Sequence, residues 1–320
     1  MNQPSSTTSK NTNEIQYIGI DVCKARLDIH GIEGLDHVAN SPEGHKKILQ
    51  KLKPKLHQIA LEATGGYEDR FIFQLHSKAI KVSRIEASRV RDYAKSIGRL
   101  AKNDMIDARS ITEYAQHVKP AALVPPSAEQ SQLKALCSVR QQLVDHCSNL
   151  TKQLQQTYHA VAVKHLEKTI KDLAKQIGKI EKEIKDLLEK DEFKTKAQRL
   201  MQIKGVGLVG ASGALGYMPE MGTISATKAT ALVGVAPMQN QSGTKEKQRR
   251  IKGGRAKLRR IIYMNAICCI RHNSQFKALY KRLRQAGKPV KVAVVAVMRK
   301  LVILMNRLLS DTNFNLAEEK

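Results

Sequence analysis

The chain has 320 residues, of which 42% are hydrophobic, and this is enough to bury the cores of two compact domains. Its formal net charge of +26 indicates a polyanionic partner, because basic side chains release counterions from a phosphate backbone. No apolar run approaches the roughly 18 residues that a membrane-spanning helix needs. The composition therefore favours a nucleic-acid partner and counts against a membrane protein.

Neither the two ends of the chain nor its cysteines indicate a catalytic or metal-binding role. Residues 1–14 are polar and lack the apolar core of a secretory signal, so we expect a disordered leader on a cytosolic chain, and residues 313–320 form a short tail. The five cysteines form no CxxC pair and no zinc-binding spacing with histidine. We expect them to be reduced and structural.

Residues 15–124 alternate short β-like runs with helical segments, which is typical of an α/β domain. We predict strands at residues 17–22, 26–31, 57–61 and 81–85. Two prolines and Ser127 then mark a domain boundary, because they stop one element and cap the next.

Residues 125–193 form a predicted coiled-coil connector. Their apolar positions alternate steps of four and three, which is the seam of a coiled coil that needs a partner helix. The partner is either the preceding helix folded back as a hairpin or the same segment of a second protomer, and we favour a hairpin that also dimerises. The seam consists of Leu166, Ile170, Leu173, Ile177, Ile180, Ile184 and Leu187.

Residues 194–312 form a predicted basic domain, mainly helical. Between Lys247 and Ser310 there are 18 Lys and Arg residues and no Asp or Glu. Near its start, residues 200–215 suggest a helix-hairpin-helix, in which Gly205 and Gly207 would let backbone N–H groups approach a DNA phosphate. A plain tight turn between packed helices explains these glycines almost as well.

Four acidic residues occupy positions where an α/β fold gathers functional side chains. Asp21 lies inside one apolar run and Glu62 closes another, and strand ends of this kind face the crevice of the sheet. Asp104 and Asp107 are three residues apart, so a helix would place both on one face. Each acid alone is explained as a turn or capping residue. Together they favour a site for Mg²⁺ or Mn²⁺, since paired divalent ions can activate a nucleophile on a phosphodiester.

Ser242 stands beside Gly243 and precedes a run of basic residues. Positive charge here would hold a nucleic-acid backbone and stabilise charge developing on a phosphate, although an ordinary Ser-Gly turn explains the pair as well. Serine also needs a base or a metal to activate it, and no neighbouring His or Lys stands out as that base. We expect nucleic-acid contacts from Lys245, Lys247, Arg249, Arg250, Lys252, Arg255, Lys257, Arg259 and Arg260.

These motifs resemble those of a known family. The runs GIDVCKARLD, LEATGGYE and KNDMIDA, followed by Pro-x4-Ser-Gly, look like the motifs of the DEDD transposases of insertion sequences. The resemblance extends over residues 17–311. The N-terminal domain of that family is similar to RuvC Holliday-junction resolvases, and the family includes the Piv-type DNA invertases.

The resemblance implies an RNase H-like (RuvC-like) fold and a site-specific recombinase. It assigns Asp21, Glu62, Asp104 and Asp107 to divalent metal, and Ser242 to a nucleophile that forms a covalent link to DNA. It further implies DNA partners at the element ends and the target, a structured guide RNA, and a homo-oligomer that is a dimer or, when active, a tetramer. Such a chain would act in the prokaryotic cytoplasm at the nucleoid.

Two other interpretations stay open. In a junction-resolving nuclease, water would attack the phosphodiester and Ser242 would only cap a turn. In a non-catalytic nucleic-acid-binding protein, the basic domain and the coiled coil would suffice, but the acids would have no explanation.

Overall fold

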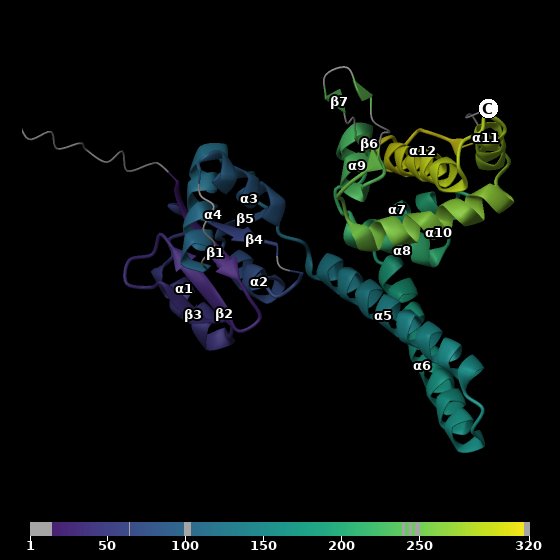
Figure 1. Ribbon diagram of the computed structural model, residues 1–320, viewed down its shortest axis with the longest axis horizontal. Coiled ribbons are helices and arrows are strands. Elements are labelled where there is room, and N and C mark those ends of the chain that lie inside the picture. The colour runs from purple at the N-terminus through teal and green to yellow at the C-terminus, as the bar shows by residue number, and fades with distance from the viewer. Residues whose placement is uncertain are drawn as a thin grey trace, which may run out of the picture. The chain divides into compact units, whose positions relative to one another are not determined.

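The computed structural model describes residues 15–63, 65–98, 104–238, 241–242, 245–246 and 250–316, with the backbone alone for residues 104–106, 238, 241–242, 245–246 and 250. The chain divides into two compact units, Met1–Pro125 and Pro126–Lys320. Figure 1 shows a sheet with flanking helices in the first unit and helices dominating the second.

The first unit is built on a five-stranded mixed sheet of order β3-β2-β1-β4-β5. The strands β1, β2 and β3 pair antiparallel, whereas β4 and β5 run parallel to β1. This order is compatible with the RNase H-like fold implied by the resemblance. The four predicted strands are confirmed to within one residue at each end, and β3 was not predicted. The strands are β1 (Gln16–Val22), β2 (Arg26–His30), β3 (His37–Ala39), β4 (His57–Glu62) and β5 (Lys81–Ile85).

Helices cover both faces of this sheet, which explains why β1 and β4 are buried along most of their length. On one face, Ile20 and Leu61 belong to a core with Phe71 of α2. On the other face, Tyr17 and Ala60 belong to a second core with residues of α3 and α4. The four helices are α1 (Pro42–Lys51), α2 (Asp69–Ser77), α3 (Ala87–Ser96) and α4 (Asp104–Val118).

The second unit begins with a helical hairpin, α5 (Ala128–Gln156) and α6 (Ala160–Leu188). Ser127 caps α5, because its hydroxyl oxygen accepts a hydrogen bond of 2.9 Å from the Gln130 N–H. The two helices lie side by side (Figure 1), joined by an ion pair between Arg140 and Glu181. The earlier helix is therefore one partner of the predicted seam. A coiled coil with a second protomer stays a prediction.

The rest of the second unit is a helical bundle around a large apolar core that includes Leu200, Ile262 and Leu301. Arg199 fastens the last helix, because its guanidinium donates to four carbonyl oxygens near the end of that helix at 2.6–3.1 Å. No helix of the described residues is long and apolar enough to cross a membrane. The helices are α7 (Lys194–Met201), α8 (Leu208–Tyr217), α9 (Ala226–Val233), α10 (Ala256–His272), α11 (Ser274–Gln285) and α12 (Val290–Ser310). Two short ladders pair β6 (Pro237–Met238) with β9 (Arg250–Ile251) and β7 (Gln241–Ser242) with β8 (Lys245–Glu246).

Candidate functional site

The register of the sheet sets Asp21 beside Glu62. β1 and β4 pair in parallel from Gln16 and His57 up to Ile20 and Leu61, so the next position along each strand carries an acid. Side chains at paired positions of neighbouring strands point to the same face. Asp21 and Glu62 are both half-buried at the carboxyl edge of the sheet.

Helix α4 covers the face on which these two acids lie. A β-carbon at Gly19 would stand 2.3 Å from the Ala108 carbonyl oxygen, so only glycine allows α4 to approach β1 this closely. The helix begins at Asp104, and Asp107 lies in its first turn, half-buried. The predicted helix over this acidic pair is confirmed. The side chain of Asp104 lies outside the described part of the chain.

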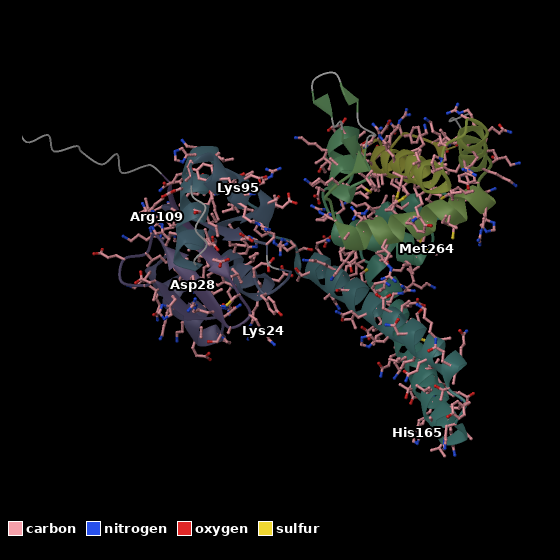
Figure 2. The ribbon with its side chains drawn as sticks, viewed as in Figure 1. Lys24, Asp28, Lys95, Arg109, His165 and Met264 are labelled. Atoms are coloured by element: carbon pink, nitrogen blue, oxygen red, sulfur yellow. The ribbon has the colours of Figure 1, made fainter. Side chains whose placement is uncertain are left out.

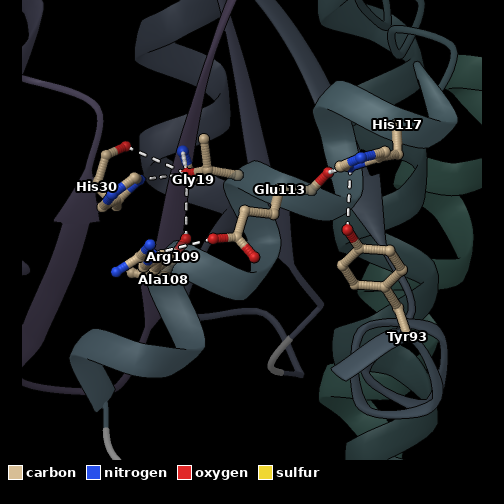
Figure 3. A network of polar contacts seen from close by, with 8 residues as sticks. Gly19, His30, Tyr93, Ala108, Arg109, Glu113 and His117 are labelled. Carbon is tan, nitrogen blue, oxygen red and sulfur yellow. Dashed lines mark hydrogen bonds and ion pairs between the residues drawn. The ribbon is translucent and has the colours of Figure 1, made fainter. Parts of the chain in front are cut away.

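A buried hydroxyl holds α4 in place. Thr112 is 1% exposed, and its Oγ1 accepts a hydrogen bond of 2.9 Å from the Gly19 N–H and lies 3.0 Å from Nδ1 of His30. Figure 3 shows these contacts beside the ion pair of Arg109 with Glu113. Burial, together with the charge of Arg109, lowers the pKa of His30. This shift favours the neutral form of the His30 imidazole.

Asp28 is an acid of this face that the sequence prediction missed. It pairs directly with Asp21 across β1 and β2 and is 4% exposed. Figure 2 labels Asp28 in the first unit. Its Oδ2 lies 3.0 Å from Nε of Arg26, which compensates its charge. The signal for it in the sequence is position, since Asp28 alternates with the buried Leu27 and Ile29 of its strand.

The donor set suits a hard divalent cation, because carboxylate oxygens are the ligands that Mg²⁺ and Mn²⁺ prefer. Among the described side chains, however, no three His, Cys, Asp or Glu residues gather into a cluster ready to hold a metal. The structure thus brings Asp21 and Glu62 together, with Asp107 on the helix that covers them. Their role as ligands stays a prediction.

Ser242 is the last residue of β7 and pairs in register with Lys245 of β8. The sequence showed no base next to this serine, whereas the ladder places a lysine position directly opposite it. Gly243, Lys247 and Arg249 lie outside the described residues, as do the side chains of Ser242, Lys245 and Arg250.

The remaining predicted nucleic-acid contacts differ in how far they are already engaged. Arg255 donates to the Tyr217 carbonyl oxygen at 2.8 Å and pairs with Glu220, and Arg259 donates to the Gly253 carbonyl oxygen. Nζ of Lys257 donates to Oγ of Ser138 at 2.9 Å. Arg260 forms two hydrogen bonds with Asp145 and thereby lowers the pKa of that carboxyl. Lys252 is exposed.

The two glycines of the predicted helix-hairpin-helix lie in the turn between α7 and α8 but have different surroundings. A β-carbon at Gly205 would stand 2.6 Å from the Cys269 nitrogen, and Gly205 also has a φ of +107°. Packing against α10 therefore explains this glycine without any nucleic acid. Gly207 is exposed, with nothing near its position, and precedes the first turn of α8.

Two family models and several curated relatives match this chain. The model of DEDD transposases of the IS110 type matches residues 18–162, and the model of the transposase IS116/IS110/IS902 family matches residues 197–281. A pilin gene-inverting protein of Moraxella lacunata is 28% identical over 90% of this chain and 94% of its own length, as is that of Moraxella bovis. The transposase for insertion sequence element IS1111A of Coxiella burnetii is 22% identical over 82% of this chain and 80% of its own. The chain belongs to the DEDD transposase family of the IS110 type.

Proposed function

We propose that this recombinase breaks and rejoins DNA through Ser242, assisted by a divalent-metal site of Asp21, Glu62, Asp104 and Asp107. Family membership makes the chain a DNA-recombining enzyme. The observation that carries the finer proposal is the β1 and β4 register, which leads to Asp21 and Glu62 side by side under α4.

The chemistry divides between the two sets of residues. The Ser242 hydroxyl attacks the phosphorus of a phosphodiester, the bond from Oγ to phosphorus forms as the bond to the leaving oxygen breaks, and that oxygen takes up a proton. Divalent cations, when bound, would lower the pKa of the attacking hydroxyl and stabilise the leaving oxygen. The proton of the Ser242 hydroxyl needs an acceptor. Lys245 pairs in register with Ser242, so Lys245 is the first residue to substitute in a test for that acceptor.

The partners follow from charge and family. DNA is the substrate of this family. A structured RNA that guides the protein to its donor and target would add a second polyanion, and residues 126–320, with 36 basic and 15 acidic residues, carry charge for both. A homo-oligomer paired through α5 and α6 would let the acids of one protomer serve the serine of another.

A trapping experiment tests the serine. Supercoiled DNA carrying the flanking sequence of the gene is incubated with full-length protein in Mg²⁺ and quenched with denaturant. We expect a DNA-linked protein that disappears in Ser242→Ala and survives in Ser225→Ala, a serine that only caps α9. Cleavage without any adduct would instead favour a junction nuclease in which water attacks.

Separate variants test the acids and the assembly. Asp21→Asn and Glu62→Gln should abolish both adduct formation and Mn²⁺ binding. If both variants bind Mn²⁺ and process DNA as wild type does, these acids are not the metal site. A wild type that binds DNA but neither binds Mn²⁺ nor processes DNA would be a non-catalytic nucleic-acid-binding protein. Mixing Asp104→Ala protein with Ser242→Ala protein should restore part of the activity if the two sites work across protomers. Sequencing the nucleic acid that co-purifies with the protein tests for a guide RNA.

A further inference from the structure

Asn40 joins the two loops that follow the acidic strands. It lies between β3 and α1, and its Nδ2 donates to the carbonyl oxygen of Cys23 at 2.9 Å and to that of Tyr67 at 3.3 Å. Cys23 directly follows β1, which carries Asp21, and Tyr67 lies in the loop after β4, which ends at Glu62. One side-chain amide therefore spans the ends of both acidic strands.

Contacts of its side-chain oxygen and of its backbone N–H fix the orientation of Asn40. Both of its amide hydrogens are used, so Oδ1 is left to accept, and Nε2 of His45 lies 2.8 Å from it. His45 is fully buried, its ring packs 4.8 Å from that of Phe71, and Nδ1 lies 2.8 Å from the side-chain amide of Gln74. The Asn40 N–H also donates to the Ala25 carbonyl oxygen at 2.9 Å. Asn40 can neither turn over nor move away without breaking several hydrogen bonds.

The loop after β4 is held from a second side. Glu68 is 1% exposed, and its carboxylate accepts from the Gly66 N–H at 2.9 Å and from Arg84 at 2.5 Å. Burial opposes the ionisation of Glu68, but its backbone hydrogen bonds and the Arg84 guanidinium outweigh that effect and lower its pKa. In the sequence, Tyr67 lies between Glu62 and Glu68. Because Glu68 is held by these contacts, the neighbouring Tyr67 carbonyl oxygen is held in position to accept from Asn40.

A link between these two loops can counter the repulsion between the acids at this edge of the sheet. Neighbouring like charges on adjacent strands repel each other, and the repulsion tends to separate the strand ends when no cation is bound. Outer residues that orient carboxylate ligands commonly decide how tightly a metal binds.

We propose that Asn40, oriented by buried His45, is a positioning residue that holds the ends of β1 and β4 at the separation at which Asp21 and Glu62 bind a divalent cation. The inference rests on the proposed metal site, but the link between the loops exists without metal. It can therefore be tested on its own.

The first measurement is hydrogen exchange of the full-length, metal-free protein by mass spectrometry. Asn40→Ala should speed exchange in residues 22–26 and 65–69 together, although position 40 lies in neither segment. The matched control is Gln58→Ala, since Gln58 is a buried amide on the same sheet that donates to Ser83 and Pro120 and lies near the opposite end of β4 from Glu62. Unchanged exchange in either loop of Asn40→Ala overturns the proposal.

The second measurement is the affinity for Mn²⁺, followed by electron paramagnetic resonance. We expect Asn40→Ala and Asn40→Asp to weaken binding by roughly 10- to 100-fold, with Gln58→Ala within about twofold of wild type. His45→Phe should behave like Asn40→Ala, whereas His45→Gln, which keeps a donor toward Asn40, should retain most of the affinity. Loosened loops with unchanged Mn²⁺ affinity would rule out a positioning role. If wild type and Asp21→Asn bind Mn²⁺ equally, the metal site itself is wrong, and with it the positioning role, whatever the exchange data show.

Discussion

The two units of this chain differ in their charge and in how they position their charged residues. Residues 1–125 hold 19 basic and 14 acidic residues, a net charge of +5, whereas residues 126–320 hold 36 and 15, a net charge of +21. The first unit places its acids by the register of a sheet, where a shift of one residue would turn each acid to the other face. The second unit spreads positive charge over helices that are packed around an apolar core.

The difference shows where each unit tolerates change. Contacts around Asp21 and Glu62 depend on separations of a few ångströms, so a single added methyl group should be felt there. Attraction between a basic surface and a phosphate backbone extends over several ångströms and adds up over many residues. A single substitution near the acidic residues of the first unit should therefore have a large effect. Each substitution on the surface of the second unit should have a small effect that adds to the others.

Gly19→Ala should have the largest effect. Its β-carbon would stand 2.3 Å from the Ala108 carbonyl oxygen and 2.4 Å from Oγ1 of Thr112, so α4 must move off β1. We expect the free energy of unfolding to fall by about 3 kcal/mol in urea titrations, from overpacking and a weakened buried hydrogen bond. The control is Gly178→Ala in α6, where nothing lies within 4 Å, and it should stabilise the helix slightly. Similar losses from both variants would contradict the close approach.

Arg199→Met should have the next largest effect, and in the second unit. The substitution removes the donors that bind four carbonyl oxygens near the end of α12, at a cost of about 2 kcal/mol in unfolding free energy. Arg199→Lys should recover only part of it, because an ammonium lacks the planar fork. Faster hydrogen exchange in residues 308–316 would locate the damage. An exposed arginine of α11, Arg282, supplies the control, and an equal loss from Arg282→Met would refute the assignment.

The exposed lysines of α11 should contribute to DNA binding. Lys277 and Lys281 are exposed and one turn apart on α11, whereas Arg255 is engaged by Tyr217 and Glu220. Replacing both lysines by alanine should weaken DNA binding and reduce the slope of log affinity against log salt by about 2. Fluorescence anisotropy at several salt concentrations measures both. Lys164 and Lys168 of α6, with the same spacing, serve as the control pair, and an equal change from that pair would mean that binding follows net charge alone.

The smallest expected effect is a pH dependence of the first unit. Burial lowers the pKa of His30, His45, His57 and His76 below the ordinary value of 6.5. The unfolded chain then binds more protons than the folded one as pH falls below about 6.5, so stability is lost on acidification through that value. We expect Tm to fall by about 3 °C between pH 7 and pH 5.5, and less steeply in His45→Gln. A Tm that rises on acidification would reverse the sign and contradict the prediction.

Much of the first unit could be predicted from the sequence because its signals are local. Short β-like runs of five or six residues predicted the strands, one of them containing Asp21 and another followed by Glu62, and a spacing of three predicted the acidic pair on one helix. The strand β3 escaped because it is three residues long, and Asn40 escaped because its partners, Cys23 and Tyr67, are far from it in sequence.

The second unit was harder for the same reason. Arg255 and Arg260 read as free charges in a basic run, yet their partners lie 35 and 115 residues away. Ser242 was singled out by resemblance, since Ser-Gly is ordinary turn chemistry. Only the pairing of β7 with β8 revealed that a lysine position lies opposite it.

The thiol of Cys23, which directly follows β1, offers a site for attaching a label close to the acidic residues. Of the five cysteines, Cys23 is exposed, Cys147 and Cys268 are half-buried, and burial raises the pKa of Cys137 and of Cys269, the latter to about 12. A maleimide dye at low ratio should therefore react first at Cys23, two residues from Asp21. Energy transfer from that dye to an acceptor on the DNA would follow the approach of the scissile strand to the acidic residues in real time, without introducing any substitution.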